Sequence, residues 1–125
     1  MLPYPQIEIG KAAENDACEY LQAQGLLLLE KNFRCYVGEI DLIMQDQADI
    51  VFVEVRKRSR IDYGHAVQSI TQTKIKRLIK TATSYLQKKG WLHKKNSRFD
   101  IVTIQTINDK LELNWIKNAF QVDRS

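Results

Sequence analysis

Long apolar runs are missing from this sequence, and none approaches the roughly 20 residues needed to span a bilayer. The first residues, MLPYPQIEIGKAAE, lack the basic and apolar regions of a signal peptide. Internal repeats and low-complexity segments are absent as well. We therefore expect a cytoplasmic protein that does not enter a membrane.

Cysteine and histidine are scarce, with two residues of each type. Cys18 and Cys35 lie too far apart, with too few histidines, to form the paired ligand groups of a zinc site. A disulfide is disfavoured in the cytosol, so both thiols are expected to be reduced. His65 and His93 have no partner at a spacing that indicates metal binding or nucleophilic chemistry.

The composition is that of a folded domain. The 125 residues are 44% hydrophobic and 27% charged, which predicts one globular domain spanning residues 1–125. The net charge is only +4, but its distribution is uneven. Basic residues gather in two blocks, which would suit a polyanion: Arg56, Lys57, Arg58 and Arg60, then Lys74, Lys76, Arg77, Lys80, Lys88, Lys89, Lys94, Lys95 and Arg98.

The segment from Gly38 to Arg58 alternates apolar and charged residues and predicts a β-hairpin. Its strands are expected at Gly38–Met44 and Ile50–Arg56, with a turn between them. Strict alternation would place Glu39, Asp41 and Ile43 on one face of the first strand. The same rule groups Phe52, Glu54 and Arg56 on the second strand.

A turn centred between Gln47 and Ala48 would place Asp41 opposite Glu54 and Glu39 opposite Arg56. Opposed carboxylates destabilise a strand pair and need a counter-charge. Mg²⁺ suits this place because it prefers oxygen ligands and binds through one or two carboxylates. The alternative is a solvated edge of the sheet on which Arg56 and Arg58 neutralise the acids.

The rest of the chain predicts two helices and further strands. A helix over Ile7–Gln24 would end at Gly25, and a second helix would run over Val67–Lys89 after a loop at Ser59–Gly64. One bent strand or two short ones would cover Leu26–Glu30 and Phe33–Val37, and two later strands Arg98–Thr106 and Leu111–Ile116. The order predicts a small α/β sandwich with a mixed sheet, against which Phe120 would pack.

Lys74 differs from the other lysines of the second helix. It falls among apolar positions, so its stem can snorkel or its ammonium group can reach back to the sheet and contact phosphate. Lys76 and Arg77 point elsewhere, either as a solvated face or as phosphate contacts. The basic segment around Trp91 can stack on nucleic acid or anchor its loop to the core.

The spacing D-x₁₂-E-x-R resembles the signature of the PD-(D/E)xK nuclease superfamily. More closely, the chain resembles the YraN family of small bacterial proteins, which has that restriction-endonuclease-like fold. The matching residues extend over most of the chain: Gly10, Ala13 and Glu14; Asn32 and Arg34; Gly38, Glu39, Ile40 and Asp41; Phe52, Val53, Glu54, Val55 and Arg58; Gly64; Lys74; Arg98, Phe99 and Asp100.

The resemblance implies a three-layer core with a mixed sheet between helices, in the order α-β-β-β-α-β. It implies catalysis with Mg²⁺ or Mn²⁺ held by Asp41, Glu54 and the Val55 carbonyl oxygen, with Glu14 adding an acidic group from the first helix. The substrate would be nucleic acid, DNA in preference to RNA, and branched by analogy with junction resolvases, which also suggests a homodimer. Phosphate contacts are assigned to Arg34, Arg58, Lys74, Lys76 and Arg77.

Arg56 departs from the superfamily pattern, which has lysine at this position. An arginine can stabilise negative charge but cannot release a proton near neutral pH. Three hypotheses follow: an endonuclease-like enzyme, a nucleic-acid-binding module without catalysis, and a protein-interaction scaffold.

Overall fold

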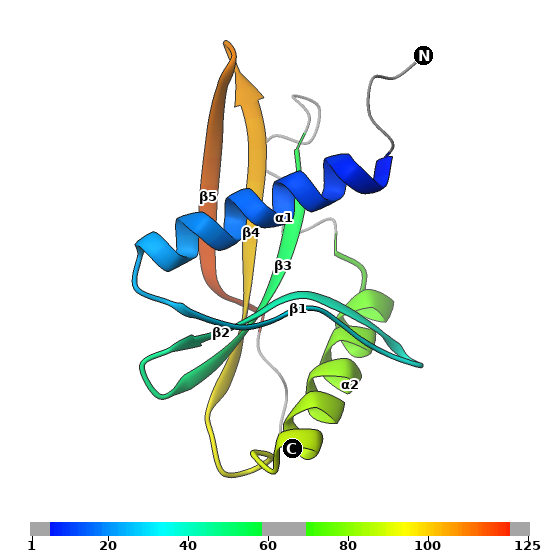
Figure 1. The fold of residues 1–125 in the computed structure, drawn as a ribbon. Coiled ribbons are helices and arrows are strands. Elements are labelled where there is room, and N and C mark those ends of the chain that lie inside the picture. The colour runs from blue at the N-terminus through cyan, green and yellow to red at the C-terminus, as the bar shows by residue number, and fades with distance from the viewer. Residues whose placement is uncertain (1–5, 59–69, 121–125) are drawn as a thin grey trace.

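The computed structural model describes residues 6–58 and 70–120, which form two helices and one five-stranded sheet (Figure 1). The predicted loop with Gly64 lies outside the described residues. In chain order the elements are α1 (Gln6–Ala23), β1 (Leu27–Cys35), β2 (Gly38–Asp46), β3 (Asp49–Lys57), α2 (Gln72–Lys89), β4 (Ser97–Ile107) and β5 (Lys110–Phe120).

The strands lie in the sheet in their order along the chain. Neighbouring strands are antiparallel except for β3 and β4, which are parallel. A parallel pair needs a long crossover connection, and this one contains α2. The predicted α/β fold with a mixed sheet is therefore confirmed.

The helices pack on opposite faces of the sheet, which gives three layers (Figure 1). On one face α1 buries Ala17 and Leu21 against a core that includes Val51 and Val53. On the other face α2 buries Tyr85 in a core that includes Ile50 and Phe52. Alternate residues of β3 therefore serve separate cores, as the period of a strand requires.

Both helices are followed by a glycine in a left-handed conformation, as the sequence predicts for Gly25. Gly25 has φ 101°, and the Leu26 N–H donates to the Leu21 carbonyl oxygen at 3.1 Å. Gly90 has φ 74°, and the Trp91 N–H donates to the Leu86 carbonyl oxygen at 2.8 Å. Each pair forms a Schellman-type C-terminal cap that pairs a carbonyl group at the helix end.

The expected start of the second helix was wrong. Residues 67–69 lie outside the described part, and the helix begins at Gln72. Thr71 is extended, and its hydroxyl oxygen accepts a hydrogen bond from the Lys74 N–H at 3.1 Å. This N-cap explains the late start, because the capping residue cannot itself be helical.

The remaining fold predictions agree well with the structure. β1 is one strand with a register shift between Leu28 and Glu30. The rings of Phe120 and Phe99 stack at 4.8 Å, as expected for a residue that packs on the core. Trp91 packs edge-on against Tyr85 at 6.1 Å, which favours its role as a loop anchor. Cys18 and Cys35 are both free thiols.

Candidate functional site

The predicted register of the β2–β3 hairpin is confirmed from its turn to the pair of Leu42 and Val53. Gln47 and Ala48 form the turn, and the ladder runs from Asp46 opposite Asp49 to Leu42 opposite Val53. The next residue on each strand is a carboxylate, Asp41 on β2 and Glu54 on β3. The two acids therefore lie where the regular pairing of these strands ends.

The backbone of β2 is irregular at Asp41. Ile40 and Ile43 are buried in the same core, although residues three apart on a regular strand face opposite sides. Opposite this point Asn32 on β1 has a positive φ of 53°. The prediction that Glu39, Asp41 and Ile43 share a face by strict alternation was therefore wrong, because the irregularity reverses the alternation.

The irregularity directs the Asp41 side chain between β2 and β3. Its Oδ2 atom accepts a hydrogen bond from the backbone N–H of Val55 at 2.8 Å. A carboxylate oxygen thus pairs with the strand N–H group just beyond the last regular pair. This hydrogen bond fixes the Asp41 carboxylate next to the strand that carries Glu54.

The electrostatic environment of Asp41 disfavours its ionised form. Burial, followed by the charge of Glu54, raises the pKa of Asp41 from 3.8 to about 7. The charges of Glu14 and Glu39 raise the pKa further, while the hydrogen bond from Val55 lowers it. Glu14 on α1 thus contributes to the field at Asp41, while its role as a site residue stays a prediction.

Glu54 is buried, with 9% of its surface exposed, and its partner is Lys74. The Nζ atom of Lys74 lies 2.7 Å from Oε1 of Glu54, while 45% of the lysine side chain remains exposed. Lys74 therefore reaches back to the sheet, one of the two alternatives open from the sequence. It brings an ammonium group from α2 to the end of β3.

Glu39 does not pair with Arg56 as predicted. It lies opposite Arg34 on β1, and the Nε atom of Arg34 is 3.4 Å from Oε2 of Glu39. The expected pair was wrong because the described ladder between β2 and β3 ends at Leu42 and Val53. The ion pairs of Glu39 and Glu54 in the described part of the chain are made with Arg34 and Lys74.

The other predicted basic residues lie on β3, directly after it, and on α2. Arg56 and Arg58 are half-buried near the end of β3, and the Arg58 backbone N–H donates to Ile104 at 2.8 Å. Lys76 and Arg77 are exposed on α2, as expected for residues that point away from the sheet. Their phosphate contacts stay a prediction.

The chemistry of the donors fits Mg²⁺ or Mn²⁺. Asp41 and Glu54 supply carboxylate oxygens, and the Val55 carbonyl is adjacent to Glu54 in sequence. Burial, followed by the charge of Glu54, raises the pKa of Asp41, and a cation would offset both effects. Within residues 6–58 and 70–120, no cluster of three or more His, Cys, Asp or Glu side chains suits a metal ion. Proteins nevertheless often bind Mg²⁺ with only one or two carboxylates, because the ion keeps several water ligands.

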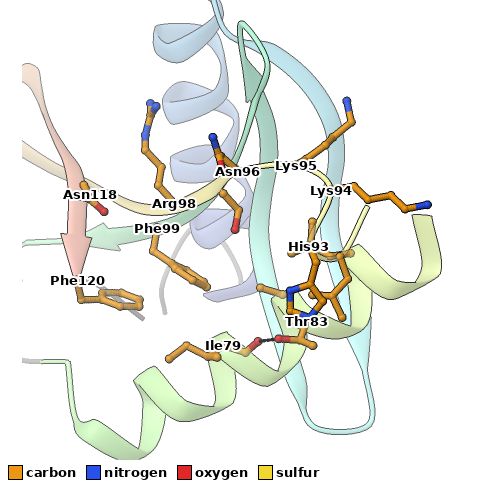
Figure 2. Close-up of a pocket in the computed structure, with 14 residues that line it drawn as sticks. Ile79, Thr83, His93, Lys94, Lys95, Asn96, Arg98, Phe99, Asn118 and Phe120 are labelled. Carbon is orange, nitrogen blue, oxygen red and sulfur yellow. Dashed lines mark hydrogen bonds between the residues drawn. The ribbon is translucent and has the colours of Figure 1, made fainter. Parts of the chain in front are cut away.

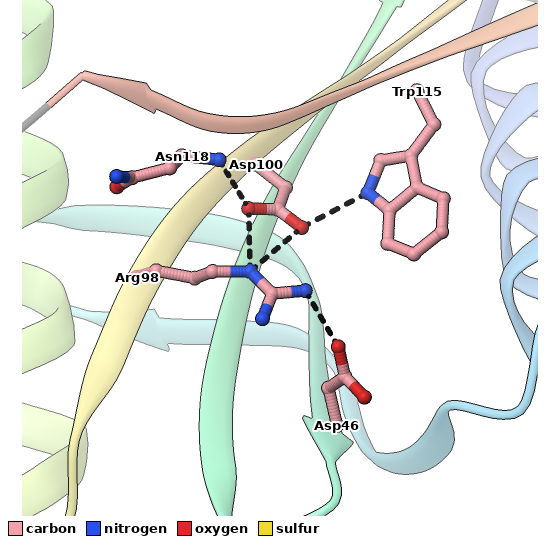
Figure 3. A network of polar contacts seen from close by, with 5 residues as sticks. All are labelled: Asp46, Arg98, Asp100, Trp115 and Asn118. Carbon is pink, nitrogen blue, oxygen red and sulfur yellow. Dashed lines mark hydrogen bonds and ion pairs between the residues drawn. The ribbon is translucent and has the colours of Figure 1, made fainter.

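A second buried acid, Asp100 on β4, lies in a network of polar contacts (Figure 3). The family resemblance includes this residue, but the sequence assigned it no role. Its carboxylate accepts hydrogen bonds from Arg98 Nε at 3.0 Å, from Trp115 Nε1 at 2.9 Å and from the Asn118 backbone N–H at 2.9 Å. Arg98 Nη2 also binds Asp46 at 2.9 Å. The available signal was the spacing of Arg98 and Asp100, which places both on one face of a strand.

A cavity of about 740 Å³ lies beside the second half of α2 and the start of β4. The rings of Phe99 and Phe120 lie along one side of it, and Lys94 and Lys95 point outward (Figure 2). The described residues that line it include none of the predicted metal ligands. The candidate site is therefore the end of the β2–β3 ladder.

Comparison with known proteins identifies a family. A family model described as "Uncharacterised protein family UPF0102" matches residues 13–104. A UPF0102 protein of Coxiella burnetii is 53% identical over 116 residues, which cover 93% of this chain and 94% of that protein. One of Nitrosococcus oceani is 44% identical over 123 residues, covering 98% and 99% of the two chains. None of the helices in the described part is long and apolar enough to cross a membrane.

Proposed function

This chain belongs to the uncharacterised protein family UPF0102, the YraN family that its motifs indicated, and we propose that it is a metal-dependent endonuclease-like protein. In this proposal it binds structured nucleic acid, DNA in preference to RNA, and hydrolyses its phosphodiesters. The observation that supports the proposal most strongly is the pairing of half-buried Asp41 with buried Glu54 at the end of the ladder, with Lys74 Nζ 2.7 Å from Glu54.

The metal would be Mg²⁺ or Mn²⁺, held by Asp41, Glu54 and the Val55 carbonyl oxygen. When bound, it would supply positive charge that acidifies a water and stabilises the charge developing on a phosphodiester. The Val55 N–H holds the Asp41 carboxylate in place. Glu54 is buried, whereas 45% of the Lys74 side chain is exposed, so water reaches the site from the side of α2.

Lys74 can supply the lysine that the superfamily pattern has at position 56, where this chain has arginine. The superfamily pattern has a lysine at that position, and arginine cannot release a proton near neutral pH. Lys74 brings a lysine ammonium group to Glu54 from α2 instead of from β3. We assign it the positioning of the reacting phosphate or water, a role for which a flexible, strongly hydrated ammonium group is suited.

The basic residues around the site would bind the substrate through its phosphates. Arg34 and Arg77 are exposed, and Arg58 follows the strand that carries Glu54. Phosphate contacts fix the position of nucleic acid without reading its sequence. Recognition would therefore depend on shape, and two copies of the chain could act together on a branched substrate.

The test is cleavage of labelled linear, flapped, gapped and four-way DNA, and of RNA, with Mg²⁺ or Mn²⁺. Wild type is compared with Glu54→Gln and Arg56→Lys, and with Leu111→Ala as a matched control at an exposed position on β5. The proposal predicts cleavage by wild type and Leu111→Ala that is lost in Glu54→Gln.

The alternative is a binding module without catalysis, which the arginine at position 56 favours. It predicts salt-sensitive binding without cleavage, because counterions released from nucleic acid make such binding fall steeply with salt. Cleavage by Arg56→Lys alone would place the loss of activity at that residue. If no variant cleaves or binds nucleic acid, both proposals are wrong and the scaffold hypothesis remains.

A further inference from the structure

The turn that joins β1 and β2 presents an aromatic side chain to solvent. Tyr36 is 100% exposed, compared with 63% for Leu27 and 47% for Leu111, the other large exposed apolar residues of the described part. A tyrosine in this state contributes nothing to either core. Its ring is free to contact a ligand with both its apolar face and its hydroxyl group.

The same turn is packed closely against α2. A Cβ atom at Gly38 would lie 2.9 Å from Oγ1 of Thr81 and 3.9 Å from Cβ of Arg77. Thr81 is buried, and its hydroxyl donates to the Arg77 carbonyl oxygen at 2.8 Å. The absence of a side chain at Gly38 therefore allows the hairpin to lie on the helix, while its end extends past α2 (Figure 1).

Two arginines border the hollow that Tyr36 helps to line. Its lining comprises residues 34–39 of the hairpin and Arg77 of α2. Its single carboxylate, Glu39, is paired with Arg34 at 3.4 Å, whereas Arg77 makes no ion pair with any described residue. An aromatic ring beside uncompensated positive charge suits a ligand that has both a flat apolar part and a negative charge.

Both elements that form this hollow also carry residues of the candidate site. Along β2, Gly38 and Asp41 are three residues apart, about 10 Å on a strand. Along α2, Arg77 and Lys74 are three residues apart, about one helical turn. A ligand in the hollow would therefore lie within a few nucleotides of Asp41 and Lys74.

We propose that Tyr36 stacks on an unpaired base of bound nucleic acid while Arg77 holds a neighbouring phosphate. This inference rests on the proposed function and narrows its substrate to nucleic acid with a single-stranded segment beside the site. Stacking tolerates any sequence because every base has a π-face. Paired bases inside a duplex are not available to the ring, so Tyr36 discriminates by strandedness.

Binding without catalysis tests the inference directly. Fluorescence anisotropy in EDTA measures the Kd of a labelled single-stranded oligonucleotide and of a blunt duplex of equal length. The proteins are wild type, Tyr36→Ala, Tyr36→Phe and the matched control Leu111→Ala. Urea unfolding of each variant verifies that stability is unchanged, as expected for fully or half-exposed side chains.

We expect Tyr36→Ala to weaken single-strand binding by about 5- to 140-fold, the range for loss of one stacked base. Tyr36→Phe and Leu111→Ala should bind within about twofold of wild type, and duplex binding should change little in every variant. Photocrosslinking of a bromodeoxyuridine oligonucleotide to wild type should label the peptide that contains Tyr36.

The outcomes separate this inference from the proposed function. Equal single-strand binding by wild type and Tyr36→Ala, or crosslinks only elsewhere, would overturn the role of Tyr36 and leave the nuclease proposal intact. Tyr36-dependent binding by a protein that cleaves nothing would support the inference within the binding-module alternative. Failure of wild type to bind either oligonucleotide would overturn both.

Discussion

Two of the aspartates in the sheet, Asp100 on β4 and Asp41 on β2, lie in contrasting environments. The carboxylate of Asp100 is 1% exposed and is paired with Arg98, the Trp115 indole and the Asn118 N–H. Among the described residues, the carboxylate of Asp41 accepts one hydrogen bond, from Val55, and lies in the field of three glutamates. One acid has complementary partners, and the other has mainly like charges around it.

The contrast separates a structural acid from a candidate functional one. A buried charge is tolerated when hydrogen bonds and an opposite charge replace its lost hydration, which describes Asp100. Although burial lowers the pKa of Arg98, its hydrogen bonds to Asp100 and Asp46 raise that pKa above its ordinary value. The ionised carboxylate of Asp41 instead destabilises the folded state. Carboxylates with pKa values perturbed in this way are concentrated at functional sites.

The largest expected effect is loss of stability on removal of the structural acid. Asp100→Ala leaves the Arg98 charge with one partner and deprives the Trp115 and Asn118 donors of theirs. Breaking a buried pair in this way costs about 3–5 kcal/mol. Urea denaturation at pH 7 measures the change, and a loss below about 1 kcal/mol would show that this network is not structural.

Removal of the charge at Asp41 should increase the stability of the folded protein, in contrast to the loss expected at Asp100. The pKa of Asp41 in the folded protein, about 7, lies above its ordinary value of 3.8, so the folded state binds more protons between these values. Stability conferred by this group is present below about pH 4 and is lost as pH rises through 7. Asp41→Asn should therefore stabilise the protein by about 1–3 kcal/mol at pH 8, since one pKa unit corresponds to about 1.4 kcal/mol.

Denaturation at pH 5 and pH 8 measures this difference, and the gain should be larger at pH 8. Glu39→Gln is the matched control, because Glu39 is the smallest contributor among the three glutamates. A loss of stability in Asp41→Asn at pH 8 would mean that its hydrogen bond to Val55 outweighs the repulsion.

Binding of a divalent metal should offset the destabilisation caused by ionised Asp41. The expected gain in stability is smaller than the effects of the two aspartate substitutions. A ligand that binds only the folded state at ten times its Kd adds about 1.4 kcal/mol of stability. We expect Mg²⁺ or Mn²⁺ to raise the Tm of wild type at pH 8 and to leave Asp41→Asn and Glu54→Gln unchanged. Equal Tm increases in wild type and both variants would place metal binding elsewhere.

Much of the fold was predictable from the sequence, since it depends on local signals. Glycine at positions 25 and 90 ends the helices, and the alternation along β3 identifies a strand between two cores. The start of α2 was not found because Thr71 is one of several polar residues that could cap a helix. The structure is needed to identify Thr71 as the residue whose hydroxyl oxygen accepts a hydrogen bond from a backbone N–H of the first turn.

The site was predictable as a pair of carboxylates but not in its detail. The centre of the β2–β3 turn determines the register of the hairpin, and this register brings Asp41 and Glu54 to the same end of the ladder. The reversal of alternation on β2 occurs opposite Asn32 of the neighbouring strand, and the Glu54–Lys74 contact depends on how α2 packs. These are tertiary effects without a periodic signal in the sequence.

The smallest expected stability change concerns the cations that accompany the two acids. Lys74 is 45% exposed, whereas Arg98 is 19% exposed and binds two aspartates. Water can replace the exposed ammonium group, so Lys74→Met should change the free energy of unfolding by at most about 1 kcal/mol. Arg98→Met should cost more, because it leaves buried Asp100 without its opposite charge. Parallel urea denaturation and cleavage assays compare the two variants. Lys74→Met should slow cleavage at least tenfold while remaining folded, whereas a loss of stability equal to that of Arg98→Met would make Lys74 a structural partner of Glu54.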